Sequence, residues 1–92
     1  MTMTFIVTNT KDESIHGYCS IDGKPLSMNP WECALRIMSW YDQNIDSPGD
    51  IDIVSRVYAV SYRKGIMHID AMRGTRKNRR VIHLMAVSQF KS

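Results

Sequence analysis

The sequence predicts an α+β fold in which a single helix packs on an antiparallel sheet, with the elements in the order ββαβββ. Five segments rich in β-branched and aromatic residues have the length of strands, and one segment combines a helix start signal with helical periodicity. Short connections between the last three strands predict an antiparallel meander. The 92 residues suffice for one modest core, so we expect a single domain over residues 1–92.

The first two strands are expected near the N-terminus, joined by a polar turn. Residues 3–9 are β-branched and aromatic, and residues 15–21 alternate well enough to form the second strand. Lys11 to Ser14 are polar and predict the turn between them. The second strand should end at residues 22–25, because Asp-Gly favours a turn and proline cannot continue a ladder.

One helix is expected over about residues 30–44. Asn29 is a favourable N-cap residue, Pro30 suits the first helical position, and Glu32 stands where a capping box places its acidic side chain. A broad apolar stripe at 100° per residue predicts the face turned toward the core, formed by Trp31, Ala34, Leu35, Met38, Tyr41 and Ile45. The segment from Asp46 to Asp50 then has the composition of a loop.

The second half of the chain predicts the three-stranded meander. Residues 52–63 are rich in Ile, Val and Tyr, residues 66–72 form the next strand, and residues 81–90 form the last. Arg63-Lys64-Gly65 predicts a tight turn between the first two of these strands. A basic loop, Arg73 to Arg80, is expected to join the last two.

The net charge of +3 conceals a split between the two halves of the sequence. Residues 1–52 contain three basic and eight acidic side chains, which gives −5, whereas residues 53–92 contain nine basic side chains and one acidic side chain, which gives +8. All of the excess positive charge therefore comes from the second half. Such asymmetry favours a polyanion or an acidic surface as partner and argues against a DNA mimic, which needs a net acidic face.

Membrane insertion and secretion are not expected. No stretch of 18 apolar residues is present, so nothing in the sequence predicts a membrane span. The first ten residues lack the basic region and the long apolar core of a secretory signal. Cys19 and Cys33 are therefore expected to be free thiols in a reducing cytoplasm, although two cysteines can also pair.

Motifs for catalysis and metal binding are weak. The sequence has no Gly-rich phosphate loop, no Gly-x-Ser-x-Gly and no Cys-x-x-Cys. His16, His68 and His83 fall on separate predicted strands, and Asp70 beside His68 is a poor basis for a metal site. We therefore expect a protein that is not an enzyme, with no cofactor, no metal and no small-molecule substrate.

The expected basic loop is the most densely charged segment. Five of its eight residues are cationic, and guanidinium groups bind phosphate and carboxylate oxygens through two parallel hydrogen bonds. We expect this cluster to contact nucleic acid phosphates or an acidic partner through Arg73, Arg76, Lys77, Arg79 and Arg80. The alternative is a solvated loop whose charges discourage edge pairing of the flanking strands.

A second basic group, Arg63 and Lys64, lies at the other end of the same predicted hairpin. At about 3.3 Å per residue the intervening strand separates the two groups by roughly 20–25 Å, which suits an extended partner better than a small ligand. Ordinary solvation of a turn is the alternative. Tyr58 and Tyr62 share a strand side with basic residues, a pattern that can stack bases, but packing under the helix is favoured for them.

The predicted helix carries a further apolar stripe away from its expected core face. Cys33, Ile37 and Trp40 follow each other at helical spacing on that side. Trp40 and Ile37 are therefore candidates for a protein interface, where aromatic side chains often contribute much of the binding energy. Alternatively, the helix is covered on two sides within the chain, or the chain dimerises.

The chain as a whole resembles the phage-encoded anti-CRISPR proteins, in particular small inhibitors of type I-F systems. The resemblance rests on the opening Met-Thr-Met-Thr-Phe-Ile-Val-Thr-Asn-Thr, on the helix entry Asn29-Pro30-Trp31-Glu32 and on the Arg-rich run from Arg73. It covers the full length, but these proteins share no common signature. No functional residue is therefore carried over by pattern.

The resemblance implies stoichiometric inhibition in the cytoplasm of the infected bacterial host. Such proteins bind the crRNA-guided type I-F surveillance (Csy) complex and block hybridisation of target DNA or recruitment of the nuclease. The basic loop is then expected to contact crRNA or an acidic Cas surface, while Trp40 and its apolar neighbours contact a Cas subunit. The alternative from another class is a small basic nucleic-acid-binding regulatory protein of a phage, and a phage structural component is a third possibility.

Overall fold

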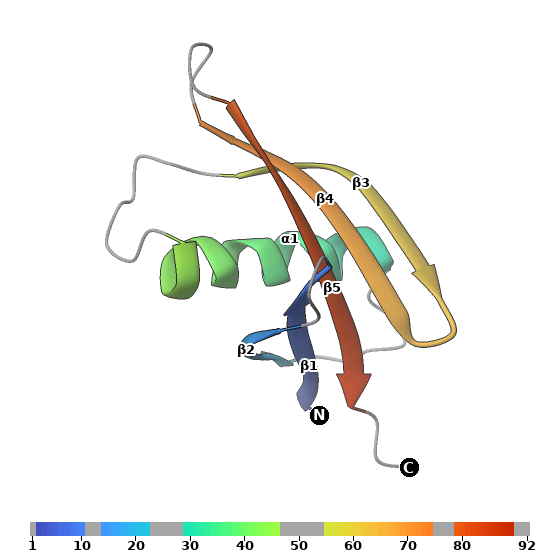
Figure 1. Ribbon diagram of the computed structural model, residues 1–92. Coiled ribbons are helices and arrows are strands. Elements are labelled where there is room, and N and C mark those ends of the chain that lie inside the picture. Colours follow the sequence, from blue (N-terminus) through green and yellow to red (C-terminus); the bar gives the residue numbers. More distant parts are fainter. Residues whose placement is uncertain (1, 11–13, 23–28, 47–54, 75–78, 90–92) are drawn as a thin grey trace.

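The computed structural model of the protein describes residues 2–10, 14–22, 29–46, 55–74 and 79–89. These residues form one antiparallel sheet with the strand order β2-β1-β5-β4-β3 and one α-helix (Figure 1). The elements are β1 (Thr2–Asn9), β2 (Ile15–Asp22), α1 (Pro30–Tyr41), β3 (Arg56–Arg63), β4 (Ile66–Gly74) and β5 (Arg79–Gln89). The predicted α+β class and the order ββαβββ are confirmed.

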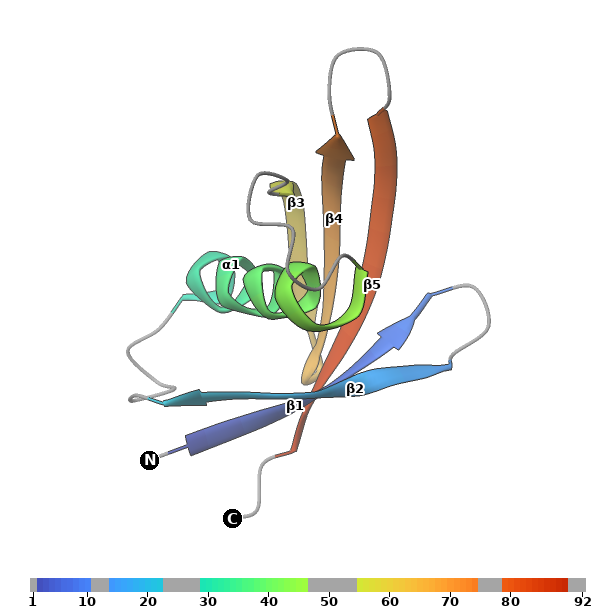
Figure 2. The ribbon, with the colours of Figure 1, turned by 90° about the vertical axis from the view of Figure 1, so that its left-hand side faces the viewer.

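Strand β5 is the central strand and joins the two halves of the chain. Its second half pairs with β1, from Thr4 opposite Gln89 to Asn9 opposite Leu84, and it pairs with β4 along nearly its whole length. The β1–β2 hairpin and the start of β5 diverge beyond the last pair (Figure 2). The spacing of elements along the sequence predicted the meander but did not specify this pairing of first and last strands.

Helix α1 begins as predicted and ends three residues early. The Asn29 side chain accepts a hydrogen bond from the backbone N–H of Glu32 at 2.8 Å, which confirms the N-cap. After Tyr41 the chain continues as a π-helical segment, Asp42–Asp46. Within it the Asn44 side chain donates to the carbonyl oxygen of Trp40 at 2.8 Å, and such side-chain bonds compete with regular helical bonding.

The core face of α1 differs from the predicted stripe. The buried helix residues are Cys33, Ala34, Ile37 and Met38, whereas Trp31 and Leu35 are 43% and 45% exposed. Two adjacent apolar stripes are present, and hydropathy alone does not decide which of them faces the sheet. The structure uses the side with Cys33 and Ala34, whose small side chains allow the helix to lie close to the strands.

The sheet contributes one face to the core, and α1 covers that face (Figure 1, Figure 2). The strand residues buried there alternate along each strand and are Phe5, Val7, Cys19, Ile21, Val57, Met67, Ile69, Ala71, Ile82, Leu84 and Ala86. Cys19 and Cys33 are buried free thiols. Burial raises the pKa of the Cys19 thiol to about 11 and also raises the pKa of Cys33.

Strands β4 and β5 are longer than predicted at the end where they approach each other in sequence. Arg73 pairs with Arg80 and Gly74 pairs with Arg79, so these residues belong to the ladder rather than to a loop. Only residues 75–78, which include Arg76 and Lys77, remain between the strands, and they lie outside the described residues. Positions 52–54 of the predicted third strand also lie outside them.

A β-bulge in β3 changes the sides on which its residues lie. Val57 pairs with Ala71 and Ala59 pairs with Asp70, which leaves Tyr58 as an extra residue. Val57 and Val60 pack on the core, whereas Tyr58 and Tyr62 are 46% and 48% exposed. The expectation that the tyrosines pack under the helix is therefore wrong for Tyr58, whereas Tyr62 pairs with Met67 on the helix side and is only half covered there.

Candidate functional site

Arg73 is part of a buried polar network and not of an exposed cationic cluster. The Asp42 carboxylate accepts hydrogen bonds from the backbone N–H of Ser55 at 2.8 Å and from the Ser55 hydroxyl at 2.6 Å. The Arg73 guanidinium lies 3.5 Å from the same carboxylate, and its side chain is 4% exposed. This network ties the end of α1 to the start of β3 and the end of β4, so Arg73 is removed from the predicted contact residues.

Strand periodicity contains a signal for this burial. Met67, Ile69, Ala71 and Arg73 alternate along β4 on the side that faces α1, and the first three are buried apolar residues. An arginine that continues such a series needs an acidic partner, because an unpaired buried charge is very unfavourable. In the sequence this arginine also begins the charged run from Arg73 to Arg80, which favoured a surface position for it.

The projecting end of the β4–β5 hairpin carries exposed cations. The ladder between β3 and β4 ends where Arg56 pairs with Met72, while β4 and β5 remain paired to Gly74 and Arg79. Arg56, Arg79 and Arg80 are all exposed. By strand alternation, Arg56 and Arg79 lie on the sheet face away from α1 and Arg80 lies on the helix side, so this end presents cations on both faces. We call these three residues the basic end.

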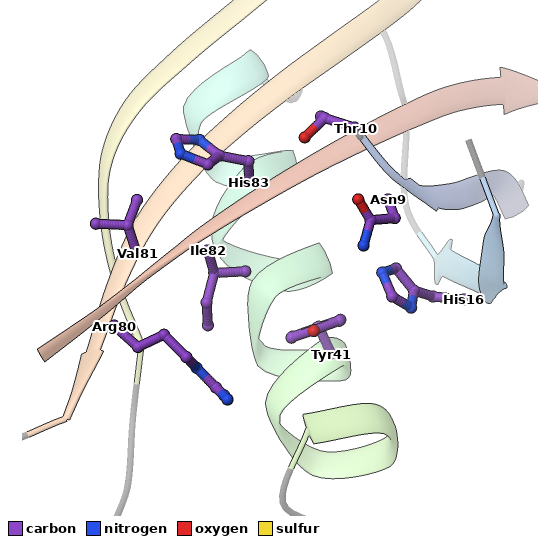
Figure 3. Close-up of a pocket in the computed structure, with 8 residues that line it drawn as sticks. All are labelled: Asn9, Thr10, His16, Tyr41, Arg80, Val81, Ile82 and His83. Carbon is purple, nitrogen blue, oxygen red and sulfur yellow. The ribbon is translucent and has the colours of Figure 1, made fainter. Parts of the chain in front are cut away.

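A cleft of about 440 Å³ opens where β5 separates from β1. Arg80 extends along one wall, Asn9 and His16 lie on the other, and Tyr41 lies at the base (Figure 3). The rings of His16 and Tyr41 meet edge to face with their centroids 5.2 Å apart. The full lining consists of Asn9, Thr10, His16, Tyr41, Arg80, Val81, Ile82 and His83. Among these residues no carboxylate is present, so the cleft extends the donor-rich surface of the basic end.

His16 reaches the cleft because of a bulge in β2. Val7 pairs with Gly17 and Thr8 pairs with Ile15, which leaves His16 as the extra residue and turns it toward Tyr41. Bulges often redirect a single side chain in this way. The sequence alternation had placed His16 on a regular strand, so this residue was missed as a cleft residue.

Ile37 and Trp40 are engaged within the chain. Ile37 is completely buried, so its prediction as an interface residue is wrong. Trp40 is partly buried and packs on the core. A Cβ atom at Gly17 would lie 3.0 Å from Cη2 of Trp40, which shows how closely the indole packs over β2. The helix is thus covered along this stripe by its own sheet, the intramolecular alternative.

Arg63 and Lys64 lie at the end of β4 opposite the basic end, as predicted. Both are exposed, and Lys64 and Gly65 adopt φ angles of 55° and 79°, which are typical of a tight hairpin turn. The Gly65 carbonyl oxygen accepts a hydrogen bond from the backbone N–H of Ser88 at 3.3 Å, which anchors the turn to β5. The nine residues of β4 therefore separate two cationic groups.

The histidines do not form a metal-binding cluster in the described part of the chain. His83 and Asp70 are paired across β5 and β4, with 2.5 Å between Nδ1 and Oδ1. Among the described residues, no group of three His, Cys, Asp or Glu side chains is arranged to hold a metal ion. Within the same residues, α1 is too short and too polar to cross a bilayer.

An exposed apolar band crosses the sheet face opposite α1. Tyr18 of β2 pairs with Ile6 of β1, Ile6 pairs with Val87 of β5, and Val87 pairs with Ile66 of β4. Tyr18 is 58% exposed and the other three are partly exposed. Sequence reasoning missed this band, although the signal was present: these strands carry apolar residues at both even and odd positions.

Comparisons of the chain with protein-family models, with curated proteins and with solved structures gave no match.

Proposed function

We propose that the protein is an anti-CRISPR inhibitor that binds the crRNA-guided type I-F surveillance complex and blocks hybridisation of target DNA. It acts by stoichiometric binding, without catalysis and without a cofactor, in the cytoplasm of an infected bacterial host. Its partners are Cas subunits of the complex and the crRNA. The basic end supplies the contact with the crRNA backbone or with an acidic Cas surface.

The observation that carries the proposal is the projection of the basic end. Arg79 and Arg80 lie where β4 and β5 extend beyond their neighbouring strands, and Arg56 lies beside them at the end of β3. A narrow two-stranded arm with cations on both faces can enter a groove and contact acidic groups on either side. Arg76 and Lys77 of the sequence between β4 and β5 add two further positive charges.

An arm that binds at the crRNA would block hybridisation of target DNA. Guide-directed recognition begins with pairing of a short seed segment, so occlusion of a few guide nucleotides stops the reaction before the heteroduplex grows. A protein of 10.6 kDa is large enough for such occlusion.

Charge reversal at one arginine tests the role of the basic end. We expect Arg79→Glu to weaken binding to a purified type I-F complex by about 10- to 100-fold, because a favourable charge contact becomes repulsive. Affinity is measured by biolayer interferometry, and capture of a labelled target duplex by the complex is measured in parallel. Both measurements should change together.

Arg36→Glu is the matched control, because Arg36 is also exposed but lies on α1. It changes the net charge by the same amount and should leave binding within about twofold of the wild type. Equal losses in the two variants would contradict a specific role of the basic end, and absence of binding by the wild type would contradict the proposal. Tight binding to naked DNA or RNA with a steep salt dependence would instead support the nucleic-acid-binding regulator.

A further inference from the structure

The apolar band is part of a row of residues that crosses all five strands of the sheet. One residue from each strand lies in register on the face opposite α1, in the order Tyr18, Ile6, Val87, Ile66 and Arg63. Arg63 completes the row because it pairs with Ile66. Val87 lies on the central strand, β5, and is therefore the middle residue of the row. The row therefore begins with an aromatic ring, ends with a guanidinium group and is aliphatic between them.

None of the described elements covers this face. In Figure 1, β4 and β5 pass in front of α1, so the helix and the core lie on the opposite side of the sheet. Ile15 of β2, which is 57% exposed, and Met85 of β5 extend the apolar surface beside the row, and the other neighbouring positions on this face are polar. Exposed apolar patches of this kind are characteristic of protein interfaces.

The row is complementary to a reversed copy of itself. Rotation by 180° about an axis parallel to β5 brings a second copy face to face with the first and reverses the order of its strands. Val87 then lies opposite Val87 of the second copy, and Ile6 lies opposite its Ile66. Tyr18 lies opposite its Arg63, and a guanidinium group over an aromatic ring is favourable.

We propose that the protein forms a homodimer through this sheet face, with the twofold axis passing close to Val87. The two sheets pack as an aligned sandwich about 10 Å apart, and each side chain of the row contacts its complement in the second copy. The interface is isologous, because the same residues of both copies form it. The proposal goes beyond the inhibitor function and does not depend on it.

The size of the face predicts a weak dimer. The part of this face around the row, without the projecting end of the β4–β5 hairpin, contains roughly 15–20 residues, which corresponds to about 500–700 Å² per copy at the usual area per interface residue. Stable dimers bury about 800 Å² per partner or more. We therefore expect a reversible dimer with a dissociation constant on the order of 10 μM to 100 μM.

Dimerisation has a geometric consequence for the basic end. Rotation about an axis parallel to the strands leaves the strand direction unchanged, so both β4–β5 hairpins project from the same end of the dimer. Their like charges repel each other, and this repulsion is screened by salt. Association should therefore strengthen as ionic strength rises, which is the reverse of an association driven by charge attraction.

Sedimentation velocity of the purified protein alone tests the proposal. We expect the wild type to change from monomer to dimer between about 1 μM and 500 μM. Val87→Glu places two carboxylates against each other at the twofold axis and should weaken dimerisation at least about tenfold. Val87 is only partly buried, and circular dichroism and thermal unfolding establish whether the variant is folded.

Leu35→Glu is the control, because it introduces the same charge at an exposed apolar residue of α1. This variant should dimerise like the wild type. A wild-type protein that stays monomeric up to 500 μM, or a dimer that Leu35→Glu weakens as much as Val87→Glu, would overturn the proposal. If Val87→Glu does not fold, the variant Tyr18→Arg is used instead, because it places a positive charge opposite Arg63 of the second copy. A Tyr18→Arg protein that dimerises as strongly as the wild type would also overturn the proposal.

Discussion

Arg73 and Arg80 face each other across the β4–β5 ladder, yet they lie in different environments. Arg73 is buried against Asp42 at the anchored part of the hairpin, whereas Arg80 is exposed beside the cleft. The sequence presents them as members of one cationic run. The difference shows that neighbouring charges of one sequence run can have different roles. Arg73 lies over the end of α1 and is buried there, whereas Arg80 remains at the surface.

The largest effect is expected from breaking the buried pair. Arg73→Ala leaves the Asp42 carboxylate buried without its cationic partner, and we expect the free energy of unfolding to fall by about 3–5 kcal/mol. Urea denaturation monitored by tryptophan fluorescence measures the loss. Arg79→Ala, at an exposed position of the same hairpin, should change stability by no more than about 0.5 kcal/mol. Similar losses in both variants would remove the distinction between the two parts of the hairpin.

The buried thiol of Cys19 predicts that the stability of the folded protein depends on pH. Its pKa is raised to about 11 in the folded protein, so between pH 9 and pH 11 the unfolded chain loses a proton that the folded chain retains. The contribution of this thiol to the free energy of unfolding is therefore complete below pH 9. The free energy of unfolding should then decrease by up to about 3 kcal/mol by pH 11. Denaturation at several pH values measures this decrease for the wild type and for Cys19→Ala. An equal decrease in both proteins would assign it to other groups.

Close packing at the β2 bulge predicts an intermediate effect. Gly17→Ala introduces a Cβ atom 3.0 Å from Cη2 of Trp40, so the indole must move, and we expect a loss of about 1–3 kcal/mol. In the background Trp40→Leu the steric part of this loss should disappear, because the ring that the Cβ atom meets is absent, whereas the strain from the positive φ of Gly17, 157°, remains. Thermal unfolding of the four proteins in this cycle gives the coupling energy. A coupling near zero would contradict the contact.

The smallest effect is expected at an exposed hydrogen-bonded pair of the open sheet face. His83→Ala removes the contact with Asp70, and both side chains are more than one third exposed. Such pairs contribute about 0–1 kcal/mol, so stability should change little. Thermal unfolding checks this expectation. A larger loss would show that the open face is more tightly constrained than its exposure indicates.

Much of the fold was predictable because it depends on local signals. The Asn29 cap and the short connection at Lys64 set the element order, and the structure retains all of the predicted strands, whereas the turn predicted after Asp22 lies outside the described residues. The core face of α1 was not predictable in the same way, because two apolar stripes compete. The pairing of β1 with β5 is a contact between distant segments for which the sequence contains no local signal.

The candidate surfaces were predicted only in part. Arg79, Arg80, Arg63 and Lys64 are exposed at opposite ends of β4, in agreement with their expected accessibility. Arg73 and Ile37 were placed on the surface by composition and helical spacing, and both are buried. The cleft at His16 depends on a one-residue bulge, and a pattern of period two cannot reveal such a bulge.

The central position of β5 has a consequence for how the chain acquires its structure. Thr4 and Gln89 are adjacent in the sheet although 85 positions separate them along the chain. Pairing of such distant segments requires closure of a long loop, which makes it intrinsically slow compared with hairpin formation. On the ribosome, the β1–β2 hairpin and α1 have no central strand to pack on until residues 79–89 emerge. We therefore expect nascent chains that stop before residue 79 to be sensitive to proteases, with protection appearing abruptly once β5 is available.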